Sequence, residues 1–597
     1  MRLFIDTEQD PWETYEGKEK DKLRKPSQER PWMKYYPSAL IGGLSVPECT
    51  LNEYLRQNCP GEDDIAIHYY GNDISWKEVF FQTESAARAL RGIGIGEGDT
   101  IPVFIKAVPE FVYLLLAAEK IGATILCRDN TLQENVDAVY KAKSKVIFAH
   151  DYLTQHEFNL FRNVAGVDLA ILLPPINNPG AGCVPEHISR YVDLQYKEYP
   201  AYGPQTLTWD RFLEKGNQFE GAVGASRNIN RPLLQVYTSG STGPSKQVIH
   251  SAYSMIGNIH QMNFYGSNDY FRPTWLVTHL PPALVAVVVT MILLPLSSNK
   301  LLILDPFCDP IDVDLEMMRY RPNCWPLIPM LIEIIMRSNR VPEDYDLSHL
   351  LSAGAGAESI NNNQLKRVQS YFKQHHCGIK FTSGYGSSEG GGNLTLPMTP
   401  HPMGNGNVGI PMPLSVMGIF EPGTHNELGY NQYGEVCCSS PGNMLGYDNV
   451  KATKVVLQKH NDGRTWLHTG DIGYMNEDGV IYILTREKTP RFNGGDLAIL
   501  PMENVVADLQ INGIKDEFFV IVPDNEHQGC FLPYLFVVIE KGYMLESVAQ
   551  EIQSKLNRTM QPVEIFEVRE RPFFHFKTSR LALAKMIREG VTDFSNV

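Results

Sequence analysis

Apolar and polar residues alternate along this chain in blocks that predict alternating helices and strands. Residues 76–91 place apolar side chains on one helical face and lead through a glycine-rich turn at 92–98 into an apolar strand at 100–105. The pattern then predicts a second helix at 109–121 and a second strand at 124–127. Because helix and strand alternate, the chain is expected to have an α/β fold built on parallel sheet.

The most hydrophobic stretch, residues 280–296, is 17 residues long and has a proline pair near its start. A membrane-spanning helix needs about 20 apolar residues, so a buried helix is the better interpretation. The first 30 residues are polar, mix basic with acidic side chains and predict no signal peptide. No membrane span is therefore expected.

The composition is that of a large globular enzyme, with 43% apolar and 20% charged residues in 597. The 53 basic and 68 acidic residues give a net charge of −15, which argues against nucleic-acid or anionic-membrane partners. The ten cysteines contain no Cys-x-x-Cys pair and favour reduced thiols in a cytoplasmic protein. One metal-like run, residues 375–377 (His-His-Cys), is interpreted as a helix end, because consecutive helical residues point in different directions.

A hydroxyl- and glycine-rich loop at residues 237–246 follows the apolar strand expected at 233–236 and predicts phosphate chemistry. Glycine lets backbone N–H groups approach phosphate oxygens, the hydroxyls add donors, and Lys246 supplies a positive charge. It is not a Walker loop, in which lysine directly follows glycine. An ordinary surface loop remains the alternative. The candidate phosphate-binding residues are Thr238, Ser239, Gly240, Ser241, Thr242, Gly243 and Lys246.

This loop closely resembles the Tyr-Thr-Ser-Gly-Ser-Thr-Gly-x-Pro-Lys loop of the adenylate-forming superfamily, which contains acyl-CoA synthetases, luciferases and adenylation domains. Four further segments, in the family's order, extend the resemblance over nearly the whole chain. They are the arm at residues 32–37, Gly384-Tyr385-Gly386-Ser387-Ser388-Glu389, Gly434-Glu435 with Gly446-Tyr447, and Thr469-Gly470-Asp471 with Gly479 and Arg486.

The resemblance implies an α/β fold with a large N-terminal domain, residues 1–487, of parallel and mixed sheets flanked by helices plus a β-rich subdomain. A small mobile α+β lid would follow at 488–597, with Lys488 as the hinge candidate. The lid departs most from the family pattern. Its nearest counterpart of the family's terminal lysine is Lys577, with Arg580 and Lys585 as alternatives.

In carboxylate adenylation an acid attacks the α-phosphorus of ATP and expels pyrophosphate, so two anions must be brought together. The resemblance implies that Glu389 binds Mg²⁺, that Tyr385 stacks on adenine and that Asp471 accepts from the ribose hydroxyls. Without the motifs, an isolated aspartate or arginine would be interpreted as a surface ion pair. The implied catalytic residues are Lys577, Glu389, Ser388 and Thr238, and the implied nucleotide contacts beyond the loop are Gly384, Tyr385, Gly386, Ser388, Asp471 and Arg486.

Weaker signals bear on the acid. Amino-acid-activating relatives carry an aspartate that pairs with the substrate ammonium, whereas residues 278–287 contain no carboxylate and favour an apolar acyl chain. Ala283 and Leu284 stand where many acyl-CoA synthetases have a gating aromatic residue or histidine. The small residues at 352–357 would leave room in an acyl pocket, or they form a tight turn.

These features predict an acid–thiol ligase that uses ATP, Mg²⁺ and CoA to activate a carboxylic acid, with fatty acids as the expected substrate class. A ligase that loads a carrier-protein phosphopantetheine is the alternative. Residues 386–390 also satisfy the Gly-x-Ser-x-Gly pattern of serine hydrolases, with Ser388 as nucleophile and His468 or His575 downstream. That last interpretation leaves the loop at 237–246 without a role.

Overall fold

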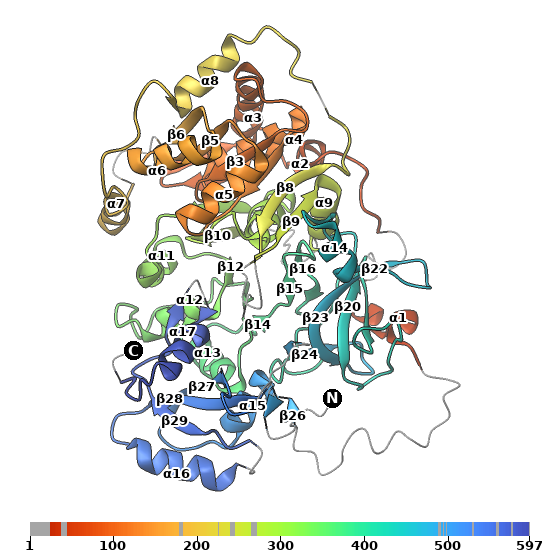
Figure 1. Cartoon of the computed structure of the whole chain (residues 1–597), viewed down its shortest axis with the longest axis vertical. Coiled ribbons are helices and arrows are strands. Elements are labelled where there is room, and N and C mark those ends of the chain that lie inside the picture. The colour runs from red at the N-terminus through yellow and green to blue at the C-terminus, as the bar shows by residue number, and fades with distance from the viewer. Residues whose placement is uncertain are drawn as a thin grey trace.

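The computed structural model describes residues 24–37, 44–177, 183–224, 226–238, 245–263, 272–356, 358–486, 491–492, 495–496, 498–527, 530–556, 560–574 and 577–595. Within these ranges, two large sheets with flanking helices occupy most of the molecule (Figure 1). A β-rich region and a small C-terminal unit lie beside them. The predicted α/β class with a β-rich subdomain and a small α+β C-terminal unit is confirmed.

The first sheet is built mainly from parallel strands, with two antiparallel pairs at one edge. Helices cover it, and its central strands are buried along their whole length because they are apolar on both faces. In sheet order its described strands are β21 (Gly446–Tyr447), β9 (Gln247–Ser251), β8 (Pro232–Tyr237), β4 (Thr124–Cys127), β3 (Thr100–Phe104), β5 (Val146–His150), β6 (Leu169–Leu173) and β7 (Thr206–Thr208). The helices of this part are α2 (Leu51–Asn58), α3 (Trp76–Gly92), α4 (Pro109–Ile121), α5 (Leu132–Ala142), α6 (Gln155–Leu160), the π-helical turn η4 (Phe161–Ala165), α7 (Glu186–Asp193), α8 (Trp209–Asn217) and α9 (Ala252–His260).

The second sheet is parallel except for a hairpin at one edge, and its core is continuous with that of the first. In sheet order its described strands are β14 (Thr382–Ser383), β13 (Ser352–Ala355), β12 (Cys324–Leu327), β10 (Thr274–Thr278), β11 (Leu301–Asp305), β1 (Ile65–Tyr69) and β2 (Asn72–Ser75). The helical segments that follow its strands are η5 (Val287–Leu293), α10 (Leu294–Ser297), η6 (Pro310–Asp312), α11 (Val313–Tyr320), α12 (Pro329–Arg337) and α13 (Asn362–Gln374).

The β-rich region is an antiparallel sheet that carries the N-terminal arm. Trp32 of this arm is buried against Gly479, where a side chain would approach the Trp32 backbone to 2.8 Å. The described strands are β19 (Val416–Phe420), β20 (Gly434–Ser439), β22 (Leu457–Lys459), β23 (Thr465–Met475) and β24 (Ile481–Arg486), with the helical segments α1 (Pro26–Glu29), η2 (Pro31–Tyr35) and α14 (Val450–Val456).

The C-terminal unit is a three-stranded sheet with helices on both faces. Side chains alternate along its first strand, so that Phe518 and Phe519 join two different apolar clusters. The described elements are α15 (Ile499–Asp508), β27 (Ile514–Pro523), β28 (Phe531–Ile539), α16 (Leu545–Lys555), β29 (Glu564–Glu567) and α17 (Arg580–Arg588), with the short pairs β25 (Arg491–Phe492) with β26 (Gly495–Asp496) and β30 (Phe573–Phe574) with β31 (Lys577–Thr578).

Several expectations can be compared with these elements. The helix expected at 109–121 and the strand at 124–127 are found with those bounds, and the helix at 76–91 and the strand at 100–105 each differ by a residue. The buried helix expected at 280–296 is shorter, because its regular helical part is η5 and α10 at 287–297. Residue 375 caps the end of α13, as expected for the run at 375–377. The predicted boundary after residue 487, with Lys488, lies outside the described residues and stays a prediction. No helix in the described ranges is long and apolar enough to cross a membrane.

Candidate active site

The predicted phosphate loop leaves the sheet at the carboxyl end of β8, and its base is closed by backbone contacts. The Thr238 N–H donates to the Lys246 carbonyl oxygen at 2.9 Å, and the Lys246 N–H donates to Thr238 Oγ1 at 3.0 Å. Residues 239–243 lie outside the described residues, so the structure gives the anchors of the loop and the direction of Lys246. The ammonium of Lys246 lies 4.9 Å from the centre of the Tyr447 ring.

Ser388 and Glu389 lie in the turn of a short hairpin, β15 (Gly386–Ser387) with β16 (Gly392–Asn393). Only glycine fits at position 386, because an added Cβ would lie 1.8 Å from the Gly392 carbonyl oxygen. The hairpin follows β14, and the Gly384 N–H donates to the Ala355 carbonyl oxygen at 2.9 Å. The sheet edge therefore positions this turn.

The Tyr-Gly and Thr-Gly-Asp motifs meet at a hydrogen bond. Tyr385 Oη donates to Asp471 Oδ2 at 2.6 Å, and Asp471 is buried with 6% of its surface exposed. Asp471 is in β23, and its register partner on β24 is Arg486, whose side chain lies outside the described residues. The structure thus brings together the aromatic residue and the carboxylate that were predicted to contact adenosine.

Two residues that were not among the predicted site residues extend this group. Tyr447 Oη donates to Glu389 Oε1 at 2.6 Å, so Tyr447 contacts both the predicted Mg²⁺ ligand and Lys246. Arg128, just after β4, places its guanidinium 4.0 Å from the centre of the Tyr237 ring. Tyr447 was part of a quoted motif without a role, whereas no sequence signal distinguished Arg128.

His250 is a third residue that the sequence did not indicate. Its Nε2 donates to the Ser388 carbonyl oxygen at 2.8 Å and fixes the turn that carries Glu389. Burial lowers the pKa of His250 to about 4, so the imidazole is neutral at physiological pH. His250 is therefore a positioning residue for this turn.

The C-terminal unit brings the β31 strand to the loop after β13. The Thr578 N–H donates to Glu358 Oε2 at 3.1 Å, and Arg580 Nη1 donates to Glu358 Oε1 at 2.6 Å. Arg580 also pairs with Glu503 of α15 at 2.9 Å. Arg580, an alternative to Lys577, therefore pairs with one glutamate of the C-terminal unit and with Glu358 outside it. Lys577 is partly buried and lies on β31, directly before Thr578, and this strand pairs with β30. Lys585, the other alternative, pairs with Glu589 on the exposed face of α17 at 3.8 Å.

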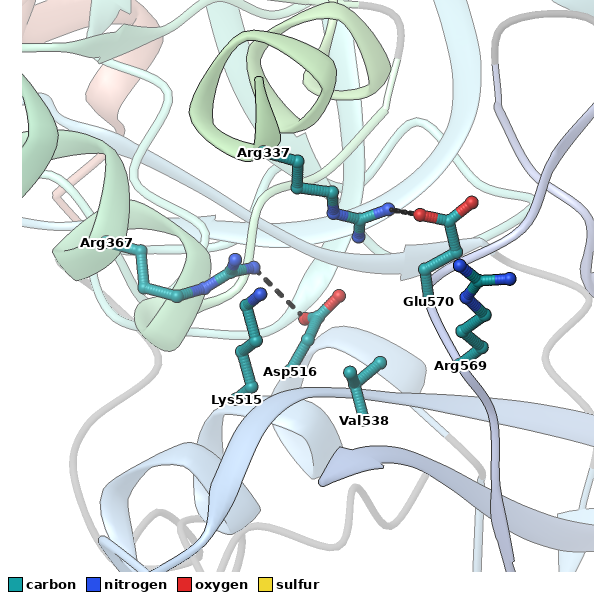
Figure 2. Close-up of a pocket in the computed structure, with 7 residues that line it drawn as sticks. All are labelled: Arg337, Arg367, Lys515, Asp516, Val538, Arg569 and Glu570. Atoms are coloured by element: carbon teal, nitrogen blue, oxygen red, sulfur yellow. Dashed lines mark hydrogen bonds and ion pairs between the residues drawn. The ribbon is translucent and has the colours of Figure 1, made fainter. Parts of the chain in front are cut away.

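A second contact region between the C-terminal unit and α12 and α13 borders an open pocket of about 200 Å³. Figure 2 shows Arg337 paired with Glu570 and Arg367 paired with Asp516 across this interface, at 2.8 Å and 3.3 Å. None of the predicted site residues lines it. The lining residues are Arg337, Arg367, Lys515, Asp516, Val538, Arg569 and Glu570.

The segment that was expected to border an acyl chain begins at the end of β10. Ala283 packs against the main core, and Leu284 is 37% exposed. The His279 N–H donates to the Asp305 carbonyl oxygen at 3.3 Å, while Tyr70 Oη donates to Asp305 Oδ1 at 2.6 Å. Burial raises the pKa of Asp305 well above its usual range, so this carboxyl is not a counter-ion for an ammonium group.

The serine-hydrolase alternative needs a strand, a sharp turn with the serine and then a helix. In the described residues, Ser388 is in the turn of an antiparallel hairpin, and its carbonyl oxygen is bound by His250. His468, one nominated base, donates instead to Glu435 Oε2 at 2.7 Å. His575 lies outside the described residues. The local geometry does not match a nucleophile elbow.

A family model described as "AMP-binding enzyme" matches residues 56–448. Among curated proteins, 4-coumarate–CoA ligase 3 of Arabidopsis thaliana is 26% identical over 483 residues, which cover 79% of this chain and 78% of that protein. The long-chain-fatty-acid–CoA ligase of Bacillus subtilis is 23% identical over 584 residues, which cover 95% of this chain and 98% of that protein.

Solved structures agree with the fold. ATP-bound MatB from Rhodopseudomonas palustris superposes with a TM-score of 0.73 at 19% identity and covers 91% of this chain and 100% of its own. The o-succinylbenzoate coenzyme A synthetase MenE from Bacillus subtilis, in complex with ATP and a magnesium ion, gives a TM-score of 0.65 at 17% identity, covering 89% and 98%.

Proposed function

Because this chain belongs to the AMP-binding enzyme family, we propose that it activates a fatty acid with ATP and transfers the acyl group to the thiol of CoA. In the first step a carboxylate oxygen bonds to the α-phosphorus, and the bond from that phosphorus to pyrophosphate breaks. In the second step the thiol sulfur bonds to the acyl carbon, and AMP leaves with the bridging oxygen. The curated relatives named above, which are CoA ligases of aromatic and long-chain acids, support the acid–CoA ligase class.

One observation carries the proposal: Tyr447 contacts both Lys246 and Glu389. Through Tyr447, the lysine of the phosphate loop is connected to the hairpin turn that carries Glu389, although the two segments are far apart in the sequence. Lys246 and Arg128 supply positive charge, which a chain of net charge −15 needs where it binds a triphosphate. We infer that Thr238 and Ser388 donate hydroxyls to phosphate oxygens beside them.

Glu389 suits a magnesium ion. Its carboxylate is held by one phenol, and its neighbours in the turn offer hydroxyl and carbonyl oxygens, the hard donors that Mg²⁺ prefers. When bound, Mg²⁺ offsets the charge that develops on the phosphates. Asp471, oriented by Tyr385, accepts from the ribose hydroxyls, with Arg486 on the neighbouring strand.

We further propose that residues 488–597 act as a lid whose Lys577 orients the acid and offsets its repulsion from the α-phosphate during adenylation. Thr578 and Arg580 support this role, because their contacts with Glu358 hold the strand of Lys577 against the loop that follows β13. An apolar acid is favoured because residues 278–287 contain no carboxylate and Asp305 is engaged by Tyr70.

The test measures the two steps separately. The enzyme is incubated with ATP, Mg²⁺ and a panel of fatty, aromatic, dicarboxylic and α-amino acids, and acid-dependent pyrophosphate exchange is followed. Then CoA or a phosphopantetheinyl carrier protein is added, and the thioester is identified by mass. Exchange with fatty acids and a mass shift on CoA are expected. Efficient exchange with a free α-amino acid would overturn the substrate class, and a thioester on the carrier alone would overturn CoA as acceptor.

A further inference from the structure

Three histidines that are far apart in the sequence meet in the β-rich region. His425 lies in the turn between β19 and β20, His460 directly follows β22, and His468 is in β23. In this sheet β23 lies between β20 and β22, which Figure 1 labels, and β19 is the other neighbour of β20. Each histidine offers one ring nitrogen, and these atoms all lie within 4.8 Å of one another. His425 is exposed and the other two are buried, so the cluster opens to solvent on one side.

The hydrogen bonds around the cluster orient its rings. His468 Nδ1 donates to Glu435 Oε2 at 2.7 Å, which leaves the lone pair of His468 on Nε2. His460 Nε2 lies 2.9 Å from that atom and donates its proton to it. The ring of His425 stacks on His460 with centroids 3.9 Å apart, and His425 Nε2 donates to Gln458 Oε1 at 2.8 Å.

We propose that His425, His460 and His468 form a binding site for a divalent transition-metal ion, with Zn²⁺ as the best fit. Three imidazoles and one open position are a common zinc ligand set. Zinc–nitrogen bonds of about 2.0 Å place two tetrahedral ligand nitrogens about 3.3 Å apart. The 2.9 Å contact between His460 and His468 therefore has to widen by only a few tenths of an ångström. The exposed ring of His425, which stacks on His460, has to turn so that its nitrogen faces the same ion. The ion takes the position of the proton between these rings, and that proton moves to His460 Nδ1.

The residues around the three histidines resemble the groups that orient the ligands of known metal sites. A carboxylate that accepts from the far nitrogen of a ligand histidine, as Glu435 does for His468, fixes the tautomer and makes the imidazole more basic. Phe420 and Trp466 pack against His460, with centroids at 5.0 Å and 5.7 Å, and form an apolar wall on the buried side. The exposed side chain of His425 marks the side of the cluster that faces solvent.

Glu435, Cys437 and His468 form a second group that shares His468. A metal ion there would need the Nδ1 lone pair of His468, which is protonated toward Glu435. Both oxygens of Glu435 are already used, because Oε1 accepts from the Gly470 N–H at 3.0 Å. All three side chains of this group are buried. The three-histidine group is therefore the better site.

Glu435 also connects the three-histidine site to the segment that carries Asp471, the proposed ribose contact. Glu435 holds His468 with one oxygen and the Gly470 N–H with the other, and Gly470 precedes Asp471. Metal binding would stiffen this connection without touching ATP. The site is separate from the Mg²⁺ proposed at Glu389 and does not depend on the adenylation chemistry.

The test uses the full-length enzyme, stripped of metal with a chelator and titrated with Co²⁺ in the absence of ATP. We expect one Co²⁺ per chain, with visible absorption of a tetrahedral site, and its displacement by Zn²⁺. His425→Asn should weaken binding about tenfold or more while the enzyme stays folded, because His425 is exposed. His401→Asn is the matched control, since His401 is a partly exposed histidine that pairs with Asp478 outside the cluster.

Cys437→Ser separates the two groups and should leave the affinity for Co²⁺ unchanged. Absence of stoichiometric Co²⁺ or Zn²⁺ uptake by the wild-type enzyme would overturn the proposal. So would equal affinity in wild type and His425→Asn, or loss of binding in Cys437→Ser alone. Because no nucleotide is present, none of these results depends on the ligase activity.

Discussion

The contact between Glu358 and the β31 strand allows a test of the proposed lid. The test measures adenylation and thioester formation separately. Glu358→Gln keeps the shape of the side chain and removes its charge. Glu358 accepts from the Thr578 N–H and from Arg580, and the nearby cations Arg580 and Arg571 hold the pKa of its carboxyl below the usual range. The carboxyl is therefore ionised at neutral pH, and the substitution weakens two charge-assisted hydrogen bonds.

A hydrogen bond to a charged group contributes about 1.5–3 kcal/mol, and glutamine keeps one acceptor oxygen. We therefore expect docking of the β31 strand to weaken by about 1.5–2 kcal/mol, or about 10-fold to 30-fold. If Lys577 acts only during adenylation, acid-dependent pyrophosphate exchange should fall by about tenfold. Conversion of a supplied acyl-adenylate to the thioester should stay within about threefold of wild type.

Glu570→Gln is the matched control. It removes a carboxylate from the same interface, where Glu570 pairs with Arg337, but the side chain of Glu570 is 59% exposed. Exposed pairs contribute about 0–1 kcal/mol, so both half-reactions should change by less than about threefold. Equal losses of both half-reactions in Glu358→Gln, or no loss in either, would refute the reasoning. If pyrophosphate exchange fell as much in Glu570→Gln as in Glu358→Gln, the loss would reflect the total charge of the interface and not the position of Lys577.

Three further predictions concern the site and its pH dependence. Glu389→Gln should slow acyl-adenylate formation by about 10²-fold or more, because it removes charge where the phosphates are held; near-normal pyrophosphate exchange would reject this role. Asp471→Ala should raise the KM for ATP about tenfold to a hundredfold, and unchanged discrimination between ATP and its 2′,3′-dideoxy analogue in the variant would exclude ribose recognition. Burial, together with the charge of Asp516, raises the pKa of Glu517 from 4.5 to about 8, so the folded enzyme holds a proton that the unfolded chain releases. Its contribution to stability is complete below about pH 4.5, declines as the pH rises and is gone above about pH 8, so Glu517→Gln should flatten the fall in Tm across this range. A variant whose Tm falls as steeply as that of wild type between pH 5.5 and 8.5 would contradict this.

The fold was largely predictable because its signals are local. The helix at 109–121 has an unbroken apolar run at 111–118, and the strand at 124–127 is buried on both faces, so both could be identified from a few consecutive residues. The motifs also predicted that Tyr385 and Asp471 act at one site, and the structure brings them into a hydrogen bond.

The remaining features depend on pairings between distant segments. His250 reaches Ser388 across 138 positions, and Glu358 reaches Arg580 across 222. Pairing of β22 with β23 brings His460 beside His468, and the turn between β19 and β20 adds His425. Such contacts cannot be predicted from a few neighbouring residues, because they depend on how distant strands pair and on how the domains pack together.

The buried carboxylate of Asp516 has a consequence for any movement of the C-terminal unit. It accepts two hydrogen bonds from Arg571 of its own unit, at 2.8 Å and 2.9 Å, and pairs with Arg367 across the interface. If the interface opened, Asp516 would keep Arg571, so the carboxylate would not be left as an isolated buried charge. Arg367 would likewise keep Glu333, with which it forms two hydrogen bonds. At this pair, each side of the interface thus keeps its own counter-ion, and separation would expose paired charges to water. Opening at this pair therefore leaves no charge without a partner, so the cost of separating Asp516 from Arg367 is limited to one of the two contacts of each side chain.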